Sequence, residues 1–206
     1  MSNDHSLDGA YSLKTPEDSV ALYKGWAETY DSEFAATHGY VLPNKVAETF
    51  LAEGGKGPVL DIGAGTGLIA EALGDVVVDG IDISQDMLDV AGKKGLYRNR
   101  ICADLTQTLD IGDGAYGGFT SSVTFTHGHV GPVCLPELMR IAAPGALFVL
   151  AIYGEVFDSA GFGSAFADLV ADSTIGPVRF RRIRIYDVTD HDHGDATGLL
   201  AIFRRL

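Results

Sequence analysis

The chain has 206 residues, a length that fits one domain with some elaboration better than two full domains. Hydrophobic residues make up 46% of it, enough to bury a core without a disulfide or a metal. The formal net charge is −13, which disfavours general affinity for nucleic-acid backbones and for anionic membranes. The longest apolar run, Ala146 to Tyr153, is too short to span a bilayer.

The N-terminus has no basic region followed by an apolar stretch, so we expect no export signal and a cytoplasmic location. The two cysteines, Cys102 and Cys134, lie in unrelated contexts, and we expect them to be buried thiols in a reducing compartment. One short segment is rich in arginine and indicates either a strand with a solvated face or a site for an anionic substrate. Its arginines are Arg179, Arg181, Arg182 and Arg184.

Residues 1–55 are predicted to be helical. A first helix begins after Thr15, whose hydroxyl is a typical cap, with Pro16 at the first helical position. A second helix begins at Pro43 and ends before Gly54.

From Pro58 onward, short aliphatic segments alternate with helical ones, a pattern typical of βαβ units and a parallel sheet. Ser84 is expected to cap one helix, and Pro144-Gly145 to stop another. The predicted elements are strand 58–62, helix 67–73, strand 76–83, helix 84–94, strand 100–103, strand 119–125, helix 135–143 and strand 146–152.

The end of the chain differs from this alternation. After a helix near residues 160–172, strands 178–187 and 196–205 are joined by a polar turn, which predicts an antiparallel hairpin. We therefore expect an α/β fold with a Rossmann-like, mostly parallel seven-stranded sheet that ends in this hairpin, with helices on both faces. Residues 1–55 would form a helical lid on a core of residues 56–206, the whole being a single domain.

A glycine-rich loop stands between the first strand and the helix after it. Gly63, Gly65 and Gly67 allow a sharp turn and bring main-chain atoms close to a ligand beside a helix N-terminus. In open α/β sheets ligands bind at the carboxyl ends of the strands, where this loop lies. The loop is therefore a predicted binding site.

The charge of the residues beside the loop helps to distinguish between two candidate ligands. Residues 65–70 also fit the G-x-G-x-x-G/A dinucleotide pattern, with Asp82 at a suitable distance. However, Asp61 precedes the glycines and would repel a pyrophosphate. The same carboxylate suits the ammonium and sulfonium groups of S-adenosylmethionine, so we favour that cofactor over a dinucleotide.

Over about residues 15–206 the sequence resembles the class I S-adenosylmethionine-dependent methyltransferase superfamily. Within that superfamily, residues 26–31 resemble the N-terminal segment of the small-molecule branch, and residues 126–130 resemble the methyltransferase-like proteins named after the Williams-Beuren region. The motifs of the superfamily as a whole match residues 61–67, 80–84, 102–105 and 144–146.

The resemblance implies a role for each acid. Asp82 would accept hydrogen bonds from the ribose hydroxyls, Asp104 from the adenine amino group, and Asp61 would orient the ammonium. The alternatives are an acid at a helix start, a turn aspartate and a turn-forming residue, respectively. The candidate cofactor residues are Trp26, Tyr30, Asp61, Ile62, Gly63, Ala64, Gly65, Gly67, Asp82, Ile83, Met87, Asp104, Leu105 and Thr126.

Some of these residues have specific expected roles. Ile83 and Met87 would enclose the adenine, although Met87 also fits a core position. Trp26 and Tyr30 are candidates to close over the cofactor, the alternative being plain packing of their helix on the sheet.

Four of the six histidines form His-x-His pairs. His127 and His129 follow the fourth strand at its carboxyl end, where either could be a general base, a substrate-positioning group or a loop residue. His191 and His193 lie in the polar turn of the hairpin. Neither pair has a helical i, i+4 spacing or an adjacent cysteine, so we expect no metal site.

The sequence thus predicts an S-adenosylmethionine-dependent methyltransferase that acts on a small-molecule acceptor by direct in-line transfer and forms S-adenosylhomocysteine. Residues 124–127 do not match the S/T-D-P-P-Y pattern of nucleic-acid amino methylation, and no membrane or nucleic-acid partner is expected. The alternatives are an NAD(P)-dependent oxidoreductase, a cofactor-binding protein without methyl transfer, and a methyltransferase with a macromolecular partner.

Overall fold

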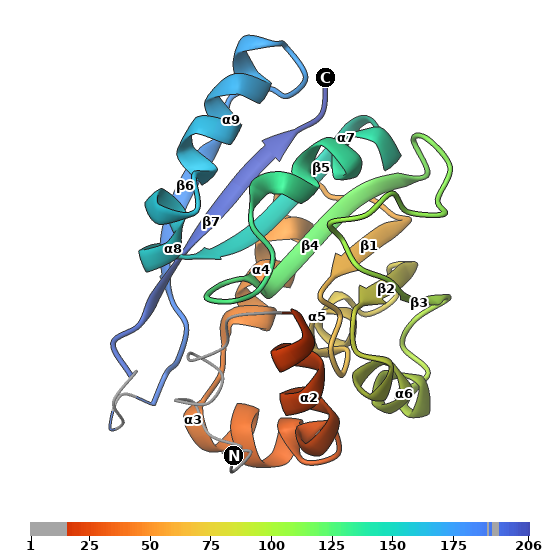
Figure 1. The fold of residues 1–206 in the computed structure, drawn as a ribbon, viewed down its shortest axis with the longest axis vertical. Helices are drawn as coiled ribbons and strands as arrows, with labels where there is room; N and C mark the ends of the chain where they lie inside the picture. The colour runs from red at the N-terminus through yellow and green to blue at the C-terminus, as the bar shows by residue number, and fades with distance from the viewer. Residues whose placement is uncertain (1–15, 189, 191–193) are drawn as a thin grey trace.

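A twisted seven-stranded sheet runs through the computed structural model, which describes residues 16–188, 190 and 194–206 (Figure 1). The strand order is β3-β2-β1-β4-β5-β7-β6. Neighbours from β3 to β5 pair in parallel, and β7 is antiparallel to both β5 and β6, which confirms the predicted sheet and its hairpin. The strands are β1 Val59–Ile62, β2 Val78–Asp82, β3 Arg100–Cys102, β4 Tyr116–Phe125, β5 Ala142–Tyr153, β6 Arg179–Arg184 and β7 Thr197–Arg204.

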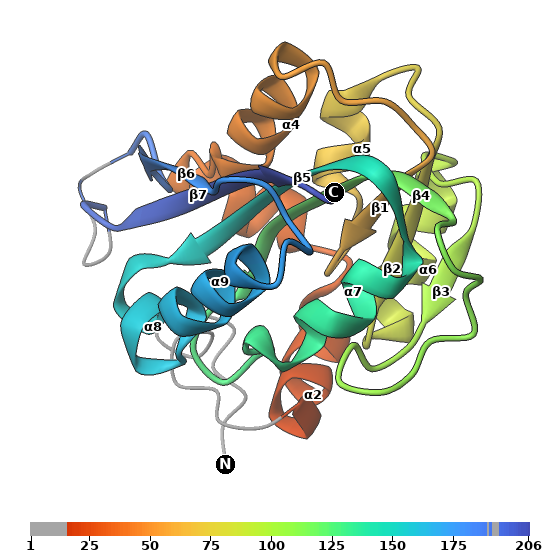
Figure 2. The ribbon, with the colours of Figure 1, turned by 90° about the horizontal axis from the view of Figure 1, so that it is seen from above.

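Helices cover both faces of the sheet (Figure 2). Alternate residues of β5 face opposite helical layers: Val149 faces one layer and Phe148 the other, and both are buried. Because both faces of the strand are covered, its second half is apolar without interruption. One face carries α4 Leu42–Ala52, α5 Leu68–Leu73 and α6 Gln85–Lys94; the other carries α7 Leu135–Ile141, α8 Gly154–Ser159 and α9 Phe162–Ala171, preceded by the short η2 Pro132–Cys134.

The first part of the described chain forms a cap beyond the carboxyl ends of the central strands (Figure 1). This N-terminal cap, residues 16–41, contains α2 Pro16–Trp26, the π-helical turn η1 Tyr30–Ala35 and α3 Ala36–His38. At one side Val41 N donates to Ile185 O at 3.1 Å, which ties the cap to the segment after β6. The helix α4 that follows packs on the sheet, with Phe50 fully buried.

The end of helix α7 was predicted wrongly. Helix α7 ends at Ile141, and Pro144-Gly145 lies inside β5 instead of stopping the helix. The register changes from Tyr116↔Ala142 to Gly118↔Leu147, so the intervening residues of β5 bulge from the ladder. A bulge accommodates a proline, which lacks an N–H, and a glycine whose φ is +80°.

The expected helix near 160–172 is α9, Phe162–Ala171. The short helix α8 before it was not predicted, and Gly161, at φ +84°, separates the two. Cys134 is buried as predicted, but Cys102 is exposed because β3 is an edge strand. The cap predicted at Thr15 lies outside the described residues.

The arginine-rich segment forms β6, the other edge of the sheet. Its arginines are exposed, and Arg179 pairs with Glu53 of the α4 end at 2.5 Å. Phe180 packs against Phe157 and Phe166 on the opposite side. These contacts fit the reading of a strand with a solvated face. No helix in the part of the chain described is long and apolar enough to cross a membrane.

Candidate functional site

One pocket opens at the carboxyl ends of β1, β2, β3 and β4, and the N-terminal cap covers it. The space between the atoms that line it, with open solvent at its mouth included, is about 1000 Å³. Asp61, Asp82 and Asp104 line it from three successive strands, and Tyr23, Tyr30 and Tyr40 line it from the cap. It is the place where the sheet topology predicts a ligand.

The glycine loop forms the floor of the pocket. Gly63 and Gly65 have φ of +66° and +52°, a left-handed conformation that favours glycine. A Cβ on Gly63 would lie 1.8 Å from Thr124 Oγ1, which itself donates to Ile62 O at 2.7 Å. The loop therefore needs glycine at residue 63 both for its backbone conformation and for its close approach to β4.

Asp82, at the end of β2, holds the loop through both of its carboxylate oxygens. Gly65 N donates to Oδ2 and Ser84 N donates to Oδ1, each at 2.8 Å. Burial raises the pKa of this carboxyl, although the backbone donors act in the opposite direction. Ser84 also caps α6 as predicted, with its Oγ accepting from Met87 N. Asp82 thus has a fixed orientation toward the pocket.

Asp61, at the end of β1, is almost completely buried and lines the centre of the pocket. Tyr97 donates its hydroxyl to Oδ2 at 2.7 Å, and Thr120 donates its hydroxyl to Oδ1 at 3.1 Å. Burial raises the pKa of Asp61 to about 7, partly opposed by these two hydrogen bonds, while the charge of Asp82 raises it further. A cation in the pocket would favour the charged form of Asp61.

The remaining cofactor candidates at this end of the pocket are Ile83, Met87, Asp104 and Leu105, which all line it. Asp104 Oδ1 accepts from the backbone N–H and from the hydroxyl of Thr106, both at 2.8 Å, so this residue also forms a turn. Its two expected roles are compatible, because the same carboxyl faces the pocket.

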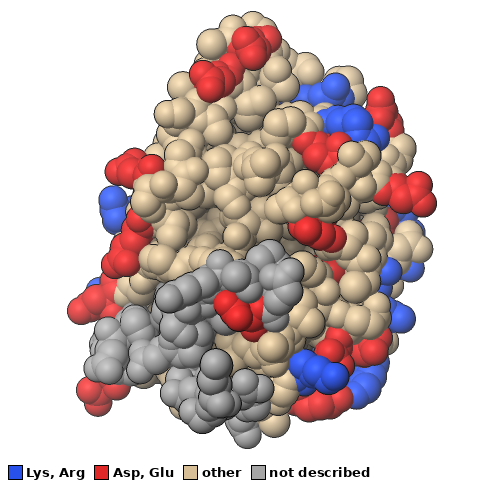
Figure 3. Space-filling model, viewed as in Figure 1, with Lys and Arg blue, Asp and Glu red and all other residues tan. Residues whose placement is uncertain are grey.

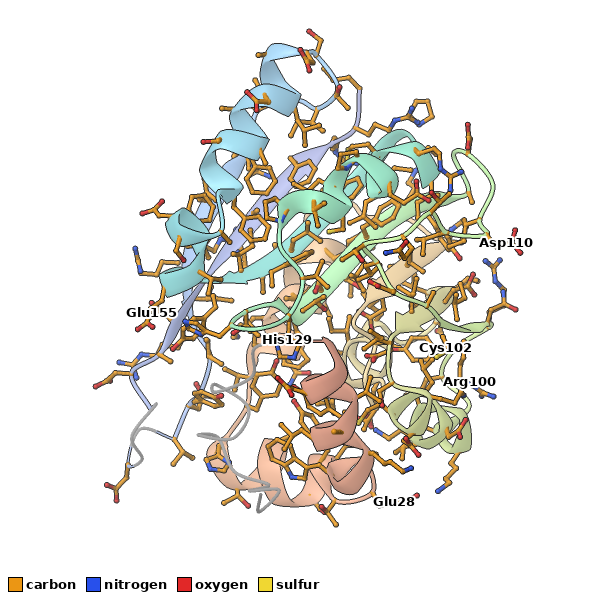
Figure 4. The ribbon with its side chains drawn as sticks, viewed as in Figure 1. Glu28, Arg100, Cys102, Asp110, His129 and Glu155 are labelled. Carbon is orange, nitrogen blue, oxygen red and sulfur yellow. The ribbon has the colours of Figure 1, made fainter. Side chains whose placement is uncertain are left out.

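The two candidate histidines point in different directions. His129 lines the pocket and lies beside α2, as Figure 4 shows, with Nε2 3.5 Å from the hydroxyl of Tyr23. His127 does not line the pocket; its Nε2 lies 3.7 Å from Glu155, and its ring packs on Tyr153. The turn between them places Gly128 at φ +69°, which separates the two side chains.

The surroundings of His129 define its protonation. Nδ1 lies 2.9 Å from the carbonyl oxygen of His127, which can only accept, so Nδ1 carries the proton and Nε2 the lone pair. Burial lowers the pKa of His129, which keeps the ring neutral at pH 7. Its Nε2 can therefore accept a proton.

Four other candidates do not line the pocket. Trp26 is 3% exposed and packs against Tyr23 and Tyr30 within the cap. Ile62 faces the core on the other side of the sheet. Gly67 begins α5, and Thr126 lies in the turn before His129. The other candidates, Gly63, Ala64, Gly65 and Tyr30 among them, do line it.

A second contact of the glycine loop joins it to the cap. Thr66 donates its hydroxyl to Asp31 Oδ1, and Lys94 of α6 donates to Asp31 Oδ2, each at 2.5 Å. The neighbouring Lys93 pairs with Glu28. Asp31, Tyr97 and Thr120 were not among the candidates, because only the tertiary structure brings them to the loop or to Asp61.

No group of three or more potential metal ligands occurs among the residues that the structure describes. The His191 and His193 pair lies outside those residues.

Comparisons with known proteins agree with this geometry. Residues 60–150 match the family described as a methyltransferase domain. No curated protein matches the chain by sequence.

Among solved structures, the chain is similar to the cyclase SpnF, with a TM-score of 0.67, 16% identity and coverage of 94% of this chain and 97% of that one. It is also similar to the Burkholderia thailandensis 1,6-didemethyltoxoflavin-N1-methyltransferase with bound S-adenosylhomocysteine, with a TM-score of 0.60, 17% identity and coverage of 94% and 91%.

A methyltransferase in complex with the Trm112 activator from Haloferax volcanii is similar as well, with a TM-score of 0.62, 19% identity and coverage of 89% and 97%. The matched residues include most of β1 and all of the glycine loop, so this part of the chain is a methyltransferase domain, and the chain as a whole shares its fold with these solved structures.

Proposed function

We propose that the chain is a class I S-adenosylmethionine-dependent methyltransferase that transfers the methyl group of S-adenosylmethionine to a small-molecule acceptor held under the N-terminal cap. One observation carries the proposal: a single pocket extends from the acids at the ends of β1, β2 and β3 to the tyrosines of the cap. A covered pocket of this kind suits a small acceptor better than a folded macromolecule. The net charge of −13 further disfavours a nucleic acid.

The acids of the pocket would bind the cofactor. Asp82 is oriented by two backbone donors and would accept hydrogen bonds from the ribose hydroxyls. Asp61 would hold the ammonium group, and Asp104 with the Leu105 N–H would recognise the adenine between Ile83 and Met87. The bound cofactor supplies an electrophilic methyl group on a sulfonium, so the protein has to position the acceptor and exclude water.

His129 is the better of the two candidate bases. It lines the pocket with an unprotonated Nε2, whereas His127 faces Glu155 away from it. A neutral imidazole at this place can take the proton that an acceptor hydroxyl loses during transfer.

The test is a calorimetric titration with S-adenosylmethionine, S-adenosylhomocysteine and NAD(H), on the wild type and on Asp82→Ala. Because Asp82 both binds and shapes the loop, we expect at least about a tenfold loss of affinity for the first two ligands. Asp110→Ala is the matched control, since Asp110 is exposed at the edge of the molecule, away from the pocket (Figure 4).

Binding that is equal in wild type and Asp82→Ala would contradict the assignment of Asp82. Once binding is established, turnover with small acceptors compared with RNA and protein substrates tests the acceptor class. Methylation of a macromolecule alone would overturn the small-molecule proposal.

A further inference from the structure

The pocket has two chemically different ends. Asp82, Met87 and Asp104 line one end, over β2 and β3. The other end, under the N-terminal cap, is lined by Tyr23, Tyr30, Tyr40, His129 and Val130, and we call these five residues the acceptor end. If the first end holds the nucleoside of the cofactor, the acceptor end is left for the acceptor. The assignment of the acceptor end therefore rests on the proposed function.

Aromatic rings dominate the acceptor end. The rings of Tyr23 and Tyr30 lie 6.3 Å apart at 69°, and the ring of His129 lies 6.1 Å from that of Tyr23. Rings at these distances and angles present both faces and edges to the pocket, and a planar aromatic guest can stack on a face or pack against an edge. A flexible aliphatic guest would gain less from such walls.

The charges in the pocket argue against an anionic guest. Within the described part of the chain, the pocket lining includes three aspartates and no lysine or arginine. Burial keeps His129 neutral through a lowered pKa. A carboxylate or phosphate would therefore lose its hydration without gaining a cationic side chain as its partner.

The arginines of the edge strand do not supply that partner. Arg179 pairs with Glu53 beyond α4, and none of the four arginines of β6 lines the pocket. In the view of Figure 3, lysines and arginines lie mainly along the periphery of the molecule, while uncharged surface predominates at the centre.

The ring of His129 contributes a hydrogen-bonding nitrogen to the acceptor end. The distance from His129 Nε2 to the Tyr23 hydroxyl, 3.5 Å, is long for a hydrogen bond. The Nε2 lone pair can thus exchange this weak contact for a shorter one to a hydroxyl on the guest.

We propose that the acceptor is an aromatic molecule with a ring hydroxyl and no anionic group, its ring against Tyr23 and Tyr30 and its hydroxyl directed at Nε2 of His129. The hydroxyl proton passes to Nε2, and an oxygen lone pair forms the new bond to the transferred methyl carbon. The electron pair of the broken methyl–sulfur bond stays on the sulfur of the departing neutral thioether. Oxygen methylation of a phenol-type ring is the resulting reaction.

A built-in reporter makes the acceptor end measurable. Trp26 is the only tryptophan of the sequence, and its ring lies 6.3 Å from Tyr23 and 5.3 Å from Tyr30. We would titrate the full chain, saturated with S-adenosylhomocysteine, with catechol, benzylamine and benzoate while following tryptophan fluorescence. Catechol is expected to bind at least tenfold more tightly than benzoate.

Variants assign the effect to the acceptor end. Tyr23→Leu should weaken catechol binding several-fold without changing the affinity for S-adenosylhomocysteine, whereas Phe180→Leu, an exposed aromatic position on β6, should change neither. Val130→Arg places a cation in the lining and should shift the preference toward benzoate. With catechol as acceptor, His129→Gln should remove the acidic limb of the pH–rate profile.

Two failures can be told apart. If the protein does not bind S-adenosylhomocysteine, the proposed function fails and this inference fails with it. If it does bind, and benzoate binds as tightly as catechol or catechol does not bind saturably, the inference alone is overturned.

Discussion

Replacing Asp61 by asparagine should change stability and cofactor binding in opposite directions. Burial raises the pKa of this carboxyl from 3.8 to about 7 in the folded chain. The folded state therefore holds the proton more tightly than the unfolded state, and the free energy of unfolding falls as the pH rises from about 4 to about 7. At 1.36 kcal/mol per pKa unit, the contribution of Asp61 to this fall is about 4 kcal/mol.

Asparagine has the same shape but cannot ionise, so Asp61→Asn should not show this part of the pH dependence. Between pH 4 and pH 8, the free energy of unfolding of the wild type should fall relative to that of the variant by up to about 4 kcal/mol. The new amide N–H₂ needs acceptors, and the hydroxyls of Tyr97 and Thr120 donate to Asp61 instead, which costs about 1–3 kcal/mol at every pH. We expect the variant to be the more stable protein at pH 8.

The affinity for the cofactor should change in the opposite direction to the stability, and should be lower in the variant. Loss of a charge-assisted contact to the ammonium group should weaken the affinity for S-adenosylmethionine about 10- to 100-fold at pH 8. The loss should be smaller at pH 6, where Asp61 of the free wild type is protonated and must release its proton on binding.

Urea unfolding and calorimetry at several pH values measure both quantities. Asp110→Asn, an exposed position with the same change of charge, is the control for general electrostatic effects. A stability difference that does not vary with pH, or an unchanged affinity at pH 8, would show that Asp61 is not a buried acid that faces the ligand.

The loop and the cap give two further predictions. Gly63→Ala should destabilise the protein by at least about 2 kcal/mol in thermal or urea unfolding, because the new Cβ would meet Thr124 at 1.8 Å with φ at +66°. Gly112→Ala, which has open space around it, should cost less than about 0.5 kcal/mol; equal effects would refute the steric reason. Asp31→Asn should break the ion pair with Lys94 and speed cofactor dissociation several-fold in stopped-flow measurements. An unchanged dissociation rate would mean that this ion pair does not hold the cap over the pocket.

The sequence was sufficient to predict the sheet because strand and helix patterns are local, and the resemblance to a known superfamily indicated the acids at its edge. Asp61, Asp82 and Asp104 each stand at or just after the end of a strand, and in a parallel sheet the carboxyl ends of adjacent strands converge at one edge. Once the strands were recognised, the convergence followed without any knowledge of side-chain packing. The glycine loop was predicted for the same reason.

Contacts between distant segments could not be predicted in this way. Tyr97 follows α6 and reaches Asp61 only because it packs across Gly80 and Gly67, where a Cβ at residue 80 would lie 2.9 Å from its ring. Trp26 occupies a helical position that fits either a core or a lid, and its ring contact with Tyr30 within the cap could not be read from that position.

His127 and His129 illustrate the same limit at a shorter range. Two residues that alternate in a strand would point to the same side, and the sequence pattern made both of them candidates. The left-handed Gly128 instead turns the chain so that only His129 reaches the pocket. Which of the two histidines lines the pocket therefore depends on the turn at Gly128.

The cap has a chemical reason to be both aromatic and firmly attached. A sulfonium methyl group reacts with any nucleophile in line with it, water included, so the site must exclude water while it admits the acceptor. On the proposed function, the rings of Tyr23 and Tyr30 would exclude water, and a cap that moved freely would readmit it. The Asp31–Lys94 pair on one side and the Val41–Ile185 backbone contact on the other restrain that movement. The same two attachments would have to loosen for product release, which is why cofactor dissociation is the measurement most sensitive to them.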